Sequence, residues 1–486
     1  MATLAEQTSA AAIWQGLATF AALPDWLNAA TDPETVVRSL SRAVPELASG
    51  ELAIQECDIG HVRIKRDVWT GVYALSVARA GSDQPTTVEL RGTILPPGYP
   101  APAEVSGSGA AFGAEGWRAF LPDLRLALEL RPPDEALPSL PILTDPERAR
   151  ELLERSIRAA SPAYRDLRIE SCEPKVMRYT PGSRCTVLYR LTYPAGLAEG
   201  RGWPELVVAK TYRGGKGRHA YAGMRALWDA PFAKSGGVAL AEPLAFLPDL
   251  NVLVQGPIRE EQTLQRLIEM AVRRGSPETD EALAMFVSKT AAGLAGLHRS
   301  GVRFGDVRTW DDELAEVRGV VDTLASAVPP IAEAAAPLLA WLEARAAGVP
   351  ADPVATAHGT FRPGQVLFHQ GEIGFIDFDS FCQAEPALDL SLFLRRTKDI
   401  ALSAPDAEGG PSGRATQAAL LARAEAICEH FLREYEAHNP VSRERIALWE
   451  ALDLFTLVLH SWTKVKPERL SNAMFALEHH LHKLGL

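Results

Sequence analysis

A short stretch around residue 370 carries side chains that could bind a divalent cation. Two apolar runs, VLF and IGFI, flank a turn at Gly371, and this pattern is typical of a β-hairpin. Gln365 and Asp377 lie equally far from Gly371, so their side chains are expected to emerge together at the open end, with Asp379 beside them. Such oxygen donors suit Mg²⁺, which proteins hold with one or two carboxylates and substrate phosphates. The alternative is a hairpin with ordinary polar ends.

The loop in front of this hairpin brings more polar groups to the same end. It runs from His358 to Gly364 and contains two glycines and Pro363, so it cannot be helical throughout. A polar loop, an amide and two carboxylates are therefore expected to converge beside two apolar strands.

A single lysine interrupts a strand pattern of the buried type at Glu205–Tyr212. Lys210 must find an anion there or keep its head in solvent. An ion pair with a structural acid is the alternative to a bound ligand. A helix is predicted after this strand, at residues 216–228.

Composition limits the classes of protein to consider. At 486 residues, two or three domains are expected, and a net charge of −11 argues against a general surface for nucleic acid or anionic membrane. The five cysteines are scattered without a CxxC pair, which favours a reducing compartment. The N-terminus has no basic segment of the secretory type, and no uncharged apolar run approaches a membrane span. We therefore expect a cytoplasmic protein.

The chain contains a diverged internal repeat. The matched segments follow in the same order and are 31–34 with 144–147, 54–58 with 169–173, 62–63 with 177–178, and 119–124 with 245–250. Each copy predicts a capped helix, several antiparallel strands and a final strand. The first copy has no counterpart of Lys210, and loop composition at 96–116 replaces the helix. It is expected to be the same module without its functional parts.

These patterns predict three parts: a duplicated module at 1–140, a β-rich lobe at 141–261, and a helical lobe with the hairpin at 262–486. Helices are expected at 282–298, 311–328, 330–347, 414–438, 443–465 and 468–483. A ligand site is expected where the last two parts meet, because pockets favour domain junctions. The basic pair Arg395–Arg396 is typical of an ordinary surface patch, although it could meet an anionic substrate.

From about residue 141 onward the chain resembles the aminoglycoside phosphotransferase family, within the protein-kinase-like fold. The motifs that carry the resemblance are HGTFRPGQ (358–365), IDFD (376–379), EPALDL (385–390), RYTPGSRC (178–185), Lys210 in its strand, and LVQGP (253–257). They imply an α+β, bilobal fold with an antiparallel β N-lobe and a mostly α C-lobe. The extra, diverged N-lobe-like module would precede it.

The resemblance also implies a cleft for ATP, or another nucleoside triphosphate, with Mg²⁺. Asp377 would be the principal metal ligand, with Gln365 in the position of a second one. Lys210 would neutralise the phosphates. The turn at Ser183 and Arg184 would cover the phosphates, and Gln255 and Gly256 would contact the adenine. Asp389 matches a carboxylate that braces the catalytic loop.

Three positions depart from the family pattern. Thr360 stands where the Asp base is expected, and a hydroxyl cannot accept a proton at neutral pH as a carboxylate does. Gln365 replaces an asparagine, and Ala222 stands near the place of the glutamate that usually pairs the lysine. His358 or Asp379 could take over the role of the base.

Three hypotheses follow from these departures. The chain could be a phosphotransferase that acts on a hydroxyl of a small molecule through a divergent site. It could be a pseudokinase, a nucleotide- or ligand-binding module that meets a protein partner through the N-terminal module. It could also be a scaffold that uses no nucleotide, or an unrelated transferase.

Overall fold

The structure, a computed structural model, describes residues 10–81, 84–102, 110–131, 134–404 and 413–486. The chain forms two compact units. The first contains the described residues of Met1–Pro133 together with Asp311–Gly348 and Ala451–Leu486, and the second contains Asp134–Trp310 and Val349–Glu450.

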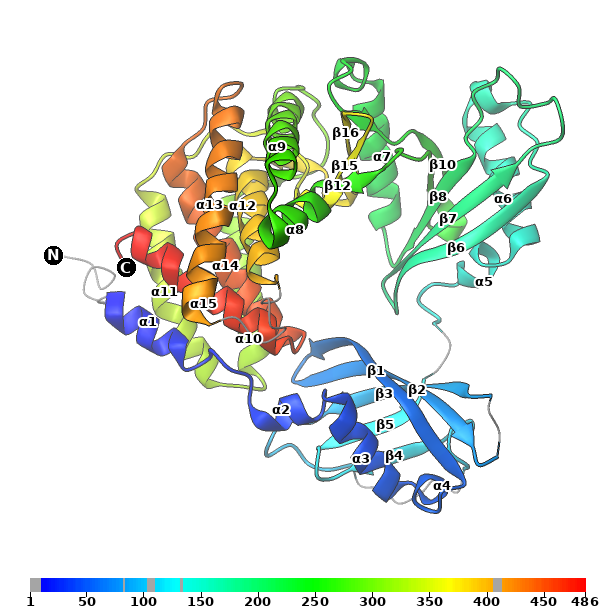
Figure 1. Cartoon of the computed structure of the whole chain (residues 1–486), viewed down its shortest axis with the longest axis vertical. Coiled ribbons are helices and arrows are strands. Elements are labelled where there is room, and N and C mark those ends of the chain that lie inside the picture. Colours follow the sequence, from blue (N-terminus) through cyan, green and yellow to red (C-terminus); the bar gives the residue numbers. More distant parts are fainter. Residues whose placement is uncertain (1–9, 82–83, 103–109, 132–133, 405–412) are drawn as a thin grey trace. The chain divides into compact units, whose positions relative to one another are not determined.

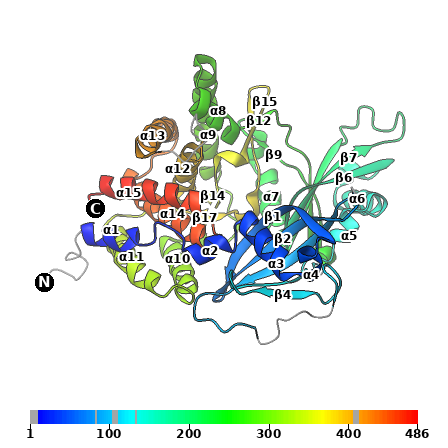
Figure 2. The ribbon, with the colours of Figure 1, turned by 60° about the horizontal axis from the view of Figure 1, so that its bottom comes forward.

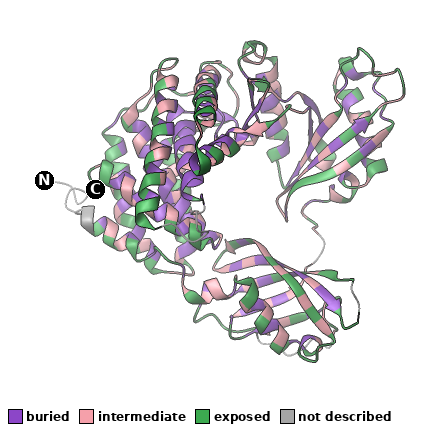
Figure 3. Cartoon of the chain, viewed as in Figure 1, coloured by how far each residue is buried: buried purple, intermediate pink, exposed green. Residues whose placement is uncertain are grey.

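The first unit is built around an antiparallel sheet (Figure 1). Its strands are β1 (Leu52–Lys65), β2 (Val68–Arg79), β3 (Thr86–Ile94), β4 (Arg118–Leu121) and β5 (Leu126–Leu130), in the order β1-β2-β3-β5-β4. Buried residues alternate along β2 (Figure 3), as expected for a strand with one face on a core. Helix α3 (Pro33–Ala43) contacts β1 and β4, and its position over the sheet can be followed in Figure 2.

Helices complete the first unit. They are α1 (Ala10–Ala18), α2 (Asp25–Ala29), α4 (Pro45–Ala48), α10 (Trp310–Ala325), α11 (Pro330–Ala347), the later part of α14 (Arg443–Thr463) and α15 (Pro467–Lys483). Buried tryptophans join these helices to the sheet. Trp69 Nε1 donates to the carbonyl of Trp462 at 3.1 Å, and Trp462 Nε1 donates to the carbonyl of Phe20 at 2.9 Å.

The second unit begins with a sheet of the same design. Its strands are β6 (Ser171–Thr180), β7 (Arg184–Thr192), β8 (Leu206–Tyr212), β10 (Pro243–Leu247) and β11 (Val252–Gln255), in the order β10-β11-β8-β7-β6. Short helix α5 (Leu140–Leu143) precedes α6 (Pro146–Ala160), which packs on β6 and β10, and α7 (Lys216–Asp229) lies between β8 and β10 in the chain. The sheet and α6 share one apolar core.

The predicted internal repeat is confirmed by these two sheets. Read from the opposite edge, the second sheet has the strand order of the first, with β6, β7, β8, β10 and β11 in the places of β1 to β5. Asp32 and Asp145 each cap the helix that precedes the sheet, accepting a hydrogen bond from the backbone N–H of Thr35 and of Arg148. Between β3 and β4 the described residues form no helix, whereas α7 fills that place in the second copy.

The rest of the second unit is mostly helical. Its helices are α8 (Leu264–Arg274), α9 (Pro277–His298), α12 (Pro386–Leu402), α13 (Arg414–Glu436) and the first residues of α14. A small sheet joins β12 (Gln262–Thr263), β15 (Val366–His369), β16 (Glu372–Phe375) and β9 (Ala239–Leu240), and another joins β13 (Val307–Arg308), β17 (Cys382–Ala384) and β14 (Ala355–Ala357).

The α+β fold class is confirmed: an antiparallel sheet precedes a mostly helical part, and a second antiparallel sheet precedes both. The domain limits at 140 and 261 stay a prediction. The predicted helices are all present within a few residues, except that 311–328 ends at Ala325 and 282–298 begins earlier, at Pro277. Within the described ranges, no helix combines the length and the apolar character that a bilayer crossing requires.

Candidate functional site

The hairpin brings Gln365 and Asp377 together as expected. Strands β15 and β16 pair antiparallel from Val366 with Phe375 to His369 with Glu372. Just beyond the Val366–Phe375 pair, at the open end, the backbone N–H of Ile376 donates to the carbonyl of Gln365 at 3.1 Å, and Gln365 Nε2 donates to Asp377 Oδ2 at 3.3 Å. Asp377 has a left-handed backbone with φ of 74°. This conformation is uncommon for a residue other than glycine and is a frequent feature of functional sites.

Lys210 faces these carboxylates from the middle of β8. Its Nζ lies 3.0 Å from Asp377 Oδ1 and 3.3 Å from Asp379 Oδ1. Burial lowers the pKa of Lys210, but the charges of Asp379 and Asp377 more than offset this, so its pKa is raised and it stays protonated. The ammonium is therefore paired with the two carboxylates that follow β16. Ala222, in α7, stands near the position where the resemblance implies a glutamate partner for the lysine.

Asp379 is surrounded by donors. Besides Lys210, it accepts a hydrogen bond from Tyr212 Oη at 2.9 Å, and Arg184 Nη1 lies 3.7 Å from its Oδ2. Burial, followed by the charge of Asp379, raises the pKa of Tyr212 well above its usual value, so the phenol keeps its proton. Asp379 is therefore an acceptor shared by Lys210, Tyr212 and Arg184.

A cavity of about 440 Å³ opens over this cluster. The residues lining it are Arg178, Arg184, Thr186, Lys210, Tyr212, Gln265, Arg362, Gly364, Gln365, Ile376, Asp377, Asp379 and Arg396. Five of these side chains are cationic and two are carboxylates. The volume suits a small-molecule site, and the charge favours an anionic ligand.

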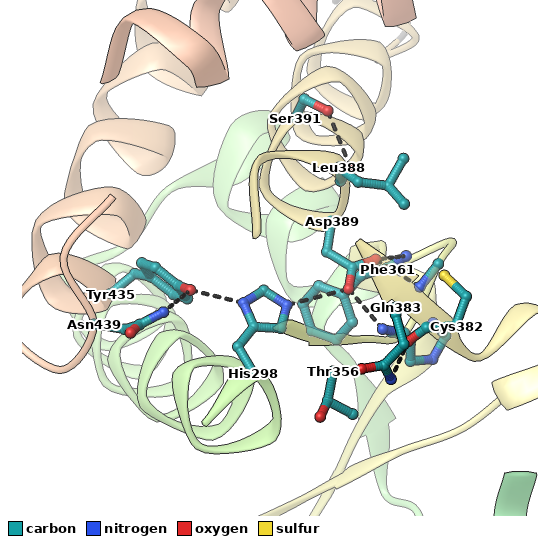
Figure 4. A network of polar contacts seen from close by, with 12 residues as sticks. His298, Thr356, Phe361, Cys382, Gln383, Leu388, Asp389, Ser391, Tyr435 and Asn439 are labelled. Carbon is teal, nitrogen blue, oxygen red and sulfur yellow. Dashed lines mark hydrogen bonds and ion pairs between the residues drawn. The ribbon is translucent and has the colours of Figure 1, made fainter. Parts of the chain in front are cut away.

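The loop before the hairpin is braced by Asp389 (Figure 4). This carboxylate is fully buried and accepts hydrogen bonds from the backbone N–H groups of His358 at 2.7 Å, Gly359 at 2.9 Å and Phe361 at 3.3 Å. His298 Nε2 donates to it at 3.2 Å, and the hydroxyl of Tyr435 lies 2.7 Å from His298 Nδ1. Asp389 thus fixes three successive parts of the loop, which accords with the bracing role that the resemblance implies.

His358 and Thr360 occupy different environments on this loop. His358 is fully buried, its Nε2 donates to the carbonyl of Ile376 at 2.9 Å, and burial lowers the pKa of its imidazole. Thr360 is partly exposed. Neither residue lines the cavity described above, so their assignment as catalytic groups stays a prediction.

Replacing Gly359 by alanine is expected to destabilise the loop by about 3 kcal/mol or more. Gly359 has φ of 81°, and a Cβ atom there would lie 2.1 Å from the carbonyl oxygen of Ser380. The left-handed backbone alone costs about 1–2 kcal/mol, and the clash adds to it. Gly371→Ala is the matched control, since Gly371 has φ of 82° but open space around it. Chemical denaturation of both variants should therefore show a clearly larger loss for Gly359→Ala, and equal losses would contradict the packing argument.

Ser183 lies at the end of the turn between β6 and β7, and Arg184 is the first residue of β7. Arg184 lines the cavity, whereas Ser183 does not. The backbone N–H of Gly182 and the hydroxyl of Tyr179 both donate to Asp134 Oδ2 at 2.7 Å. A carboxylate of the chain itself therefore already occupies one donor of the turn that the resemblance assigns to phosphates.

Gln255 and Gly256 lie at the end of β11, and neither lines the cavity. Gln255 is buried, and the backbone N–H of Gly256 donates to the carbonyl of Glu242 at 2.8 Å. Their contact with a nucleotide base stays a prediction.

The residues at the hairpin end fit a magnesium ion. The buried Gln365 Oε1 is without a hydrogen-bond partner among the described residues, as expected for an oxygen that awaits a ligand. Asp377 and Asp379 supply the other hard oxygen donors. The described residues hold no group of three or more His, Cys, Asp or Glu side chains arranged for a metal, and a site that completes its shell with phosphates and water does not need one.

Sequence reasoning missed part of the cavity. Arg178, Arg362 and Tyr212 had no assigned role, and Arg396 was noted only as part of a basic pair. Their signal was that Arg178 and Arg362 lie inside the two motifs that were already recognised, within RYTPGSRC and HGTFRPGQ.

Lys210 from an antiparallel sheet meets two carboxylates at the end of a hairpin in the mostly helical part, an arrangement that accords with the protein-kinase-like fold. In agreement, residues 230–435 match the model of the APH family, described as "Phosphotransferase enzyme family". This match includes the braced loop, the hairpin and Asp389, but not the strand with Lys210.

Solved structures similar to this chain include two kinds of small-molecule kinase. Choline kinase from Cryptosporidium parvum Iowa II is 12% identical, with 69% of this chain and 95% of that chain covered and a TM-score of 0.46. A glucosamine kinase in complex with glucosamine, ADP and inorganic phosphate is 16% identical, with coverage of 69% and 86% and a TM-score of 0.48. A further glucosamine kinase structure is 14% identical, with coverage of 95% and 98% and a TM-score of 0.45. No curated protein sequence matches the chain.

Proposed function

We propose that this chain binds a nucleoside triphosphate, ATP or a relative, with Mg²⁺ and transfers the terminal phosphoryl group to a hydroxyl of a small molecule. The observation that carries this proposal is the position of Lys210 between Asp377 and Asp379 at the base of a cationic cavity. A cation paired in this way is ready to exchange one carboxylate contact for a phosphate.

In the proposed reaction an acceptor oxygen forms a bond to the terminal phosphorus while the bond to the diphosphate breaks. Lys210 and Arg184 would neutralise the phosphates, and Asp377 with Gln365 would hold the metal ion, which spreads the charge of the transferred group when it is bound. Asp389 would keep the loop in position. The hydroxyl proton would pass to the transferred phosphoryl group or to solvent, because Thr360 cannot accept it and Asp379 is already shared by three donors.

Phosphoryl transfer depends mainly on positioning and on neutralisation of charge. Loss of a general base costs roughly 10²–10⁴-fold in rate. The proposed enzyme is therefore expected to be slow rather than inert.

Replacing Thr360 by aspartate is expected to raise the rate of phosphoryl transfer by about 10²-fold, because it returns a carboxylate to the position of the base. Thr360→Asn is the matched control, because asparagine has nearly the same shape as aspartate but is not a base. The measurement is ADP release from ATP and Mg²⁺ across a panel of hydroxylated small molecules, with folding of each variant checked by circular dichroism. If both variants bind ATP and neither turns over, the transfer proposal is contradicted.

A second candidate is a pseudokinase that binds a nucleotide or another ligand without turnover. Two observations favour it: Thr360 stands at the position of the base, and Asp134 accepts a hydrogen bond from the turn between β6 and β7 that the resemblance assigns to phosphates. In that case the N-terminal module, which repeats the strand order of the second sheet without Lys210, would meet a protein partner. For either candidate we propose a cytoplasmic protein without nucleic-acid or membrane binding.

A further inference from the structure

More cationic than acidic side chains line the cavity. Asp377 lies 3.0 Å from Lys210 and 3.6 Å from Arg362, and Asp379 is shared between Lys210 and Arg184. Two carboxylates are thus already distributed over three cations. Two further guanidinium groups, Arg178 and Arg396, line the same cavity.

These arginines reach the cavity from separate parts of the fold. Arg178 lies on β6, Arg362 on the loop before the hairpin, and Arg396 on α12. Arg396 also pairs with Asp399 on its own helix. Convergence of guanidinium groups from three elements on one cavity is hard to explain by the stability of the fold, since like charges repel one another in a partly buried place.

The electrostatics of Arg362 give independent support. Burial is the first cause that lowers the pKa of this guanidinium, the charge of Asp377 opposes it, and the charges of Arg396, Arg178 and Arg184 lower it further. Arg396, Arg178 and Arg184 are therefore close enough to disfavour the charge of Arg362. An anion placed among them would remove this cost, and the guanidinium fork matches the geometry of phosphate and carboxylate.

We propose that Arg178, Arg362 and Arg396 form an acceptor subsite for an anionic group, so that the small molecule served by this cavity carries a phosphate or a carboxylate. The inference deepens the proposed function and rests on it. Among the described residues that line the cavity, the acidic ones are Asp377 and Asp379, both taken by cations, so a cationic acceptor would find only repulsion.

The test uses the full chain saturated with ADP and Mg²⁺ and titrated by calorimetry with compounds on one carbon skeleton. These are glycerol 3-phosphate, glycerate and neutral glycerol, with ethanolamine as a small cation. We expect at least one of the two anions to bind and the other two compounds to give no signal. The tighter of glycerol 3-phosphate and glycerate identifies the group that the subsite prefers.

Three variants locate the binding. Arg178→Gln removes one charge, and Arg362→Lys keeps the charge but loses the fork. Each is expected to weaken the preferred anion about tenfold or more, and to weaken it at least several-fold more than it weakens ADP. Arg190→Gln, an exposed arginine on β7 outside the cavity, is the control and should change neither affinity.

Several results would overturn the inference while the proposed function stands. These are absence of anion binding to the ADP-loaded protein, equal loss of ADP and anion in Arg178→Gln, or displacement of ADP by glycerol 3-phosphate, which would assign the arginines to the nucleotide phosphates. If ADP itself does not bind, the proposed function fails. The same titrations on the ligand-free protein then test whether the anion subsite exists. Its existence requires that an anion binds and that Arg178→Gln weakens this binding.

Discussion

Replacing Asp389 by alanine is expected to lower the free energy of unfolding of the second unit by about 3–5 kcal/mol, the largest stability effect that we predict for a single substitution. The carboxylate is buried at 0% exposure and accepts from three backbone N–H groups and from His298. Its removal leaves these donors buried without partners, and each such group costs roughly 1–3 kcal/mol.

The charge of Asp389 also makes this contribution depend on pH. Burial alone would raise the pKa of its carboxyl group, but the hydrogen bond and charge of His298, with the neighbouring His358, lower it below the ordinary value of 3.8. A group with a lowered native pKa stabilises the fold above its unfolded pKa, and this stabilisation is lost as the pH falls through the native pKa. We therefore expect the contribution of Asp389 to be full at neutral pH and to decline below about pH 4.

Thermal and urea unfolding of Asp389→Ala and Asp389→Asn tests this expectation. Asparagine keeps the shape and one acceptor oxygen, so its loss should be smaller than that of alanine, and its stability should depend less on acid. Wild-type stability in Asp389→Ala would mean that the loop does not depend on this carboxylate.

Replacing Lys210 by methionine is expected to weaken nucleotide binding by about 100-fold, or about 2.7 kcal/mol. The ammonium is the cation closest to both carboxylates. Without it, Asp377 and Asp379 would repel the phosphates and each other. Arg184 and Arg362 remain at 3.7 and 3.6 Å, which is why we expect the protein to stay folded.

Lys175→Met is the matched control for this substitution. Lys175 is an exposed lysine on β6 of the same sheet and does not line the cavity, so its removal changes the net charge equally and should leave the affinity for nucleotide unchanged. Equal affinities of the wild type and Lys210→Met, measured by fluorescence titration with a nucleotide analogue, would place the nucleotide elsewhere.

The sequence was sufficient for much of the fold because its signals are local. The Asp-Pro-Glu starts of α3 and α6, the strand alternation and the Gly371 turn each specify a short element, and their repetition in order predicted that the two sheets are related. Helix α12 was not predicted because most of its residues are buried, and these include charged ones such as Lys398 and Asp399. No amphipathic period therefore marks it.

The candidate site was predictable where one element carries it and less so where several do. Gln365 and Asp377 follow from the symmetry of one hairpin. The pairing of Lys210 with both carboxylates joins residues 167 and 169 positions apart. The approach of Arg178, Arg362 and Arg396 from three elements likewise brings separate parts of the chain together, which no local pattern encodes. The bond of Asp134 to Gly182 is of the same kind, because it joins the segment before α5 to the turn between β6 and β7.

The central claim is that the cavity over Asp377 binds a nucleotide with magnesium. The most direct test is a calorimetric titration of ATP into the wild-type protein, first with Mg²⁺ and then with EDTA, with Lys210→Met as the reference for lost binding. We predict saturable binding of one nucleotide that is several-fold tighter with Mg²⁺. Absence of binding under both conditions, or binding that is the same in Lys210→Met, would contradict the claim.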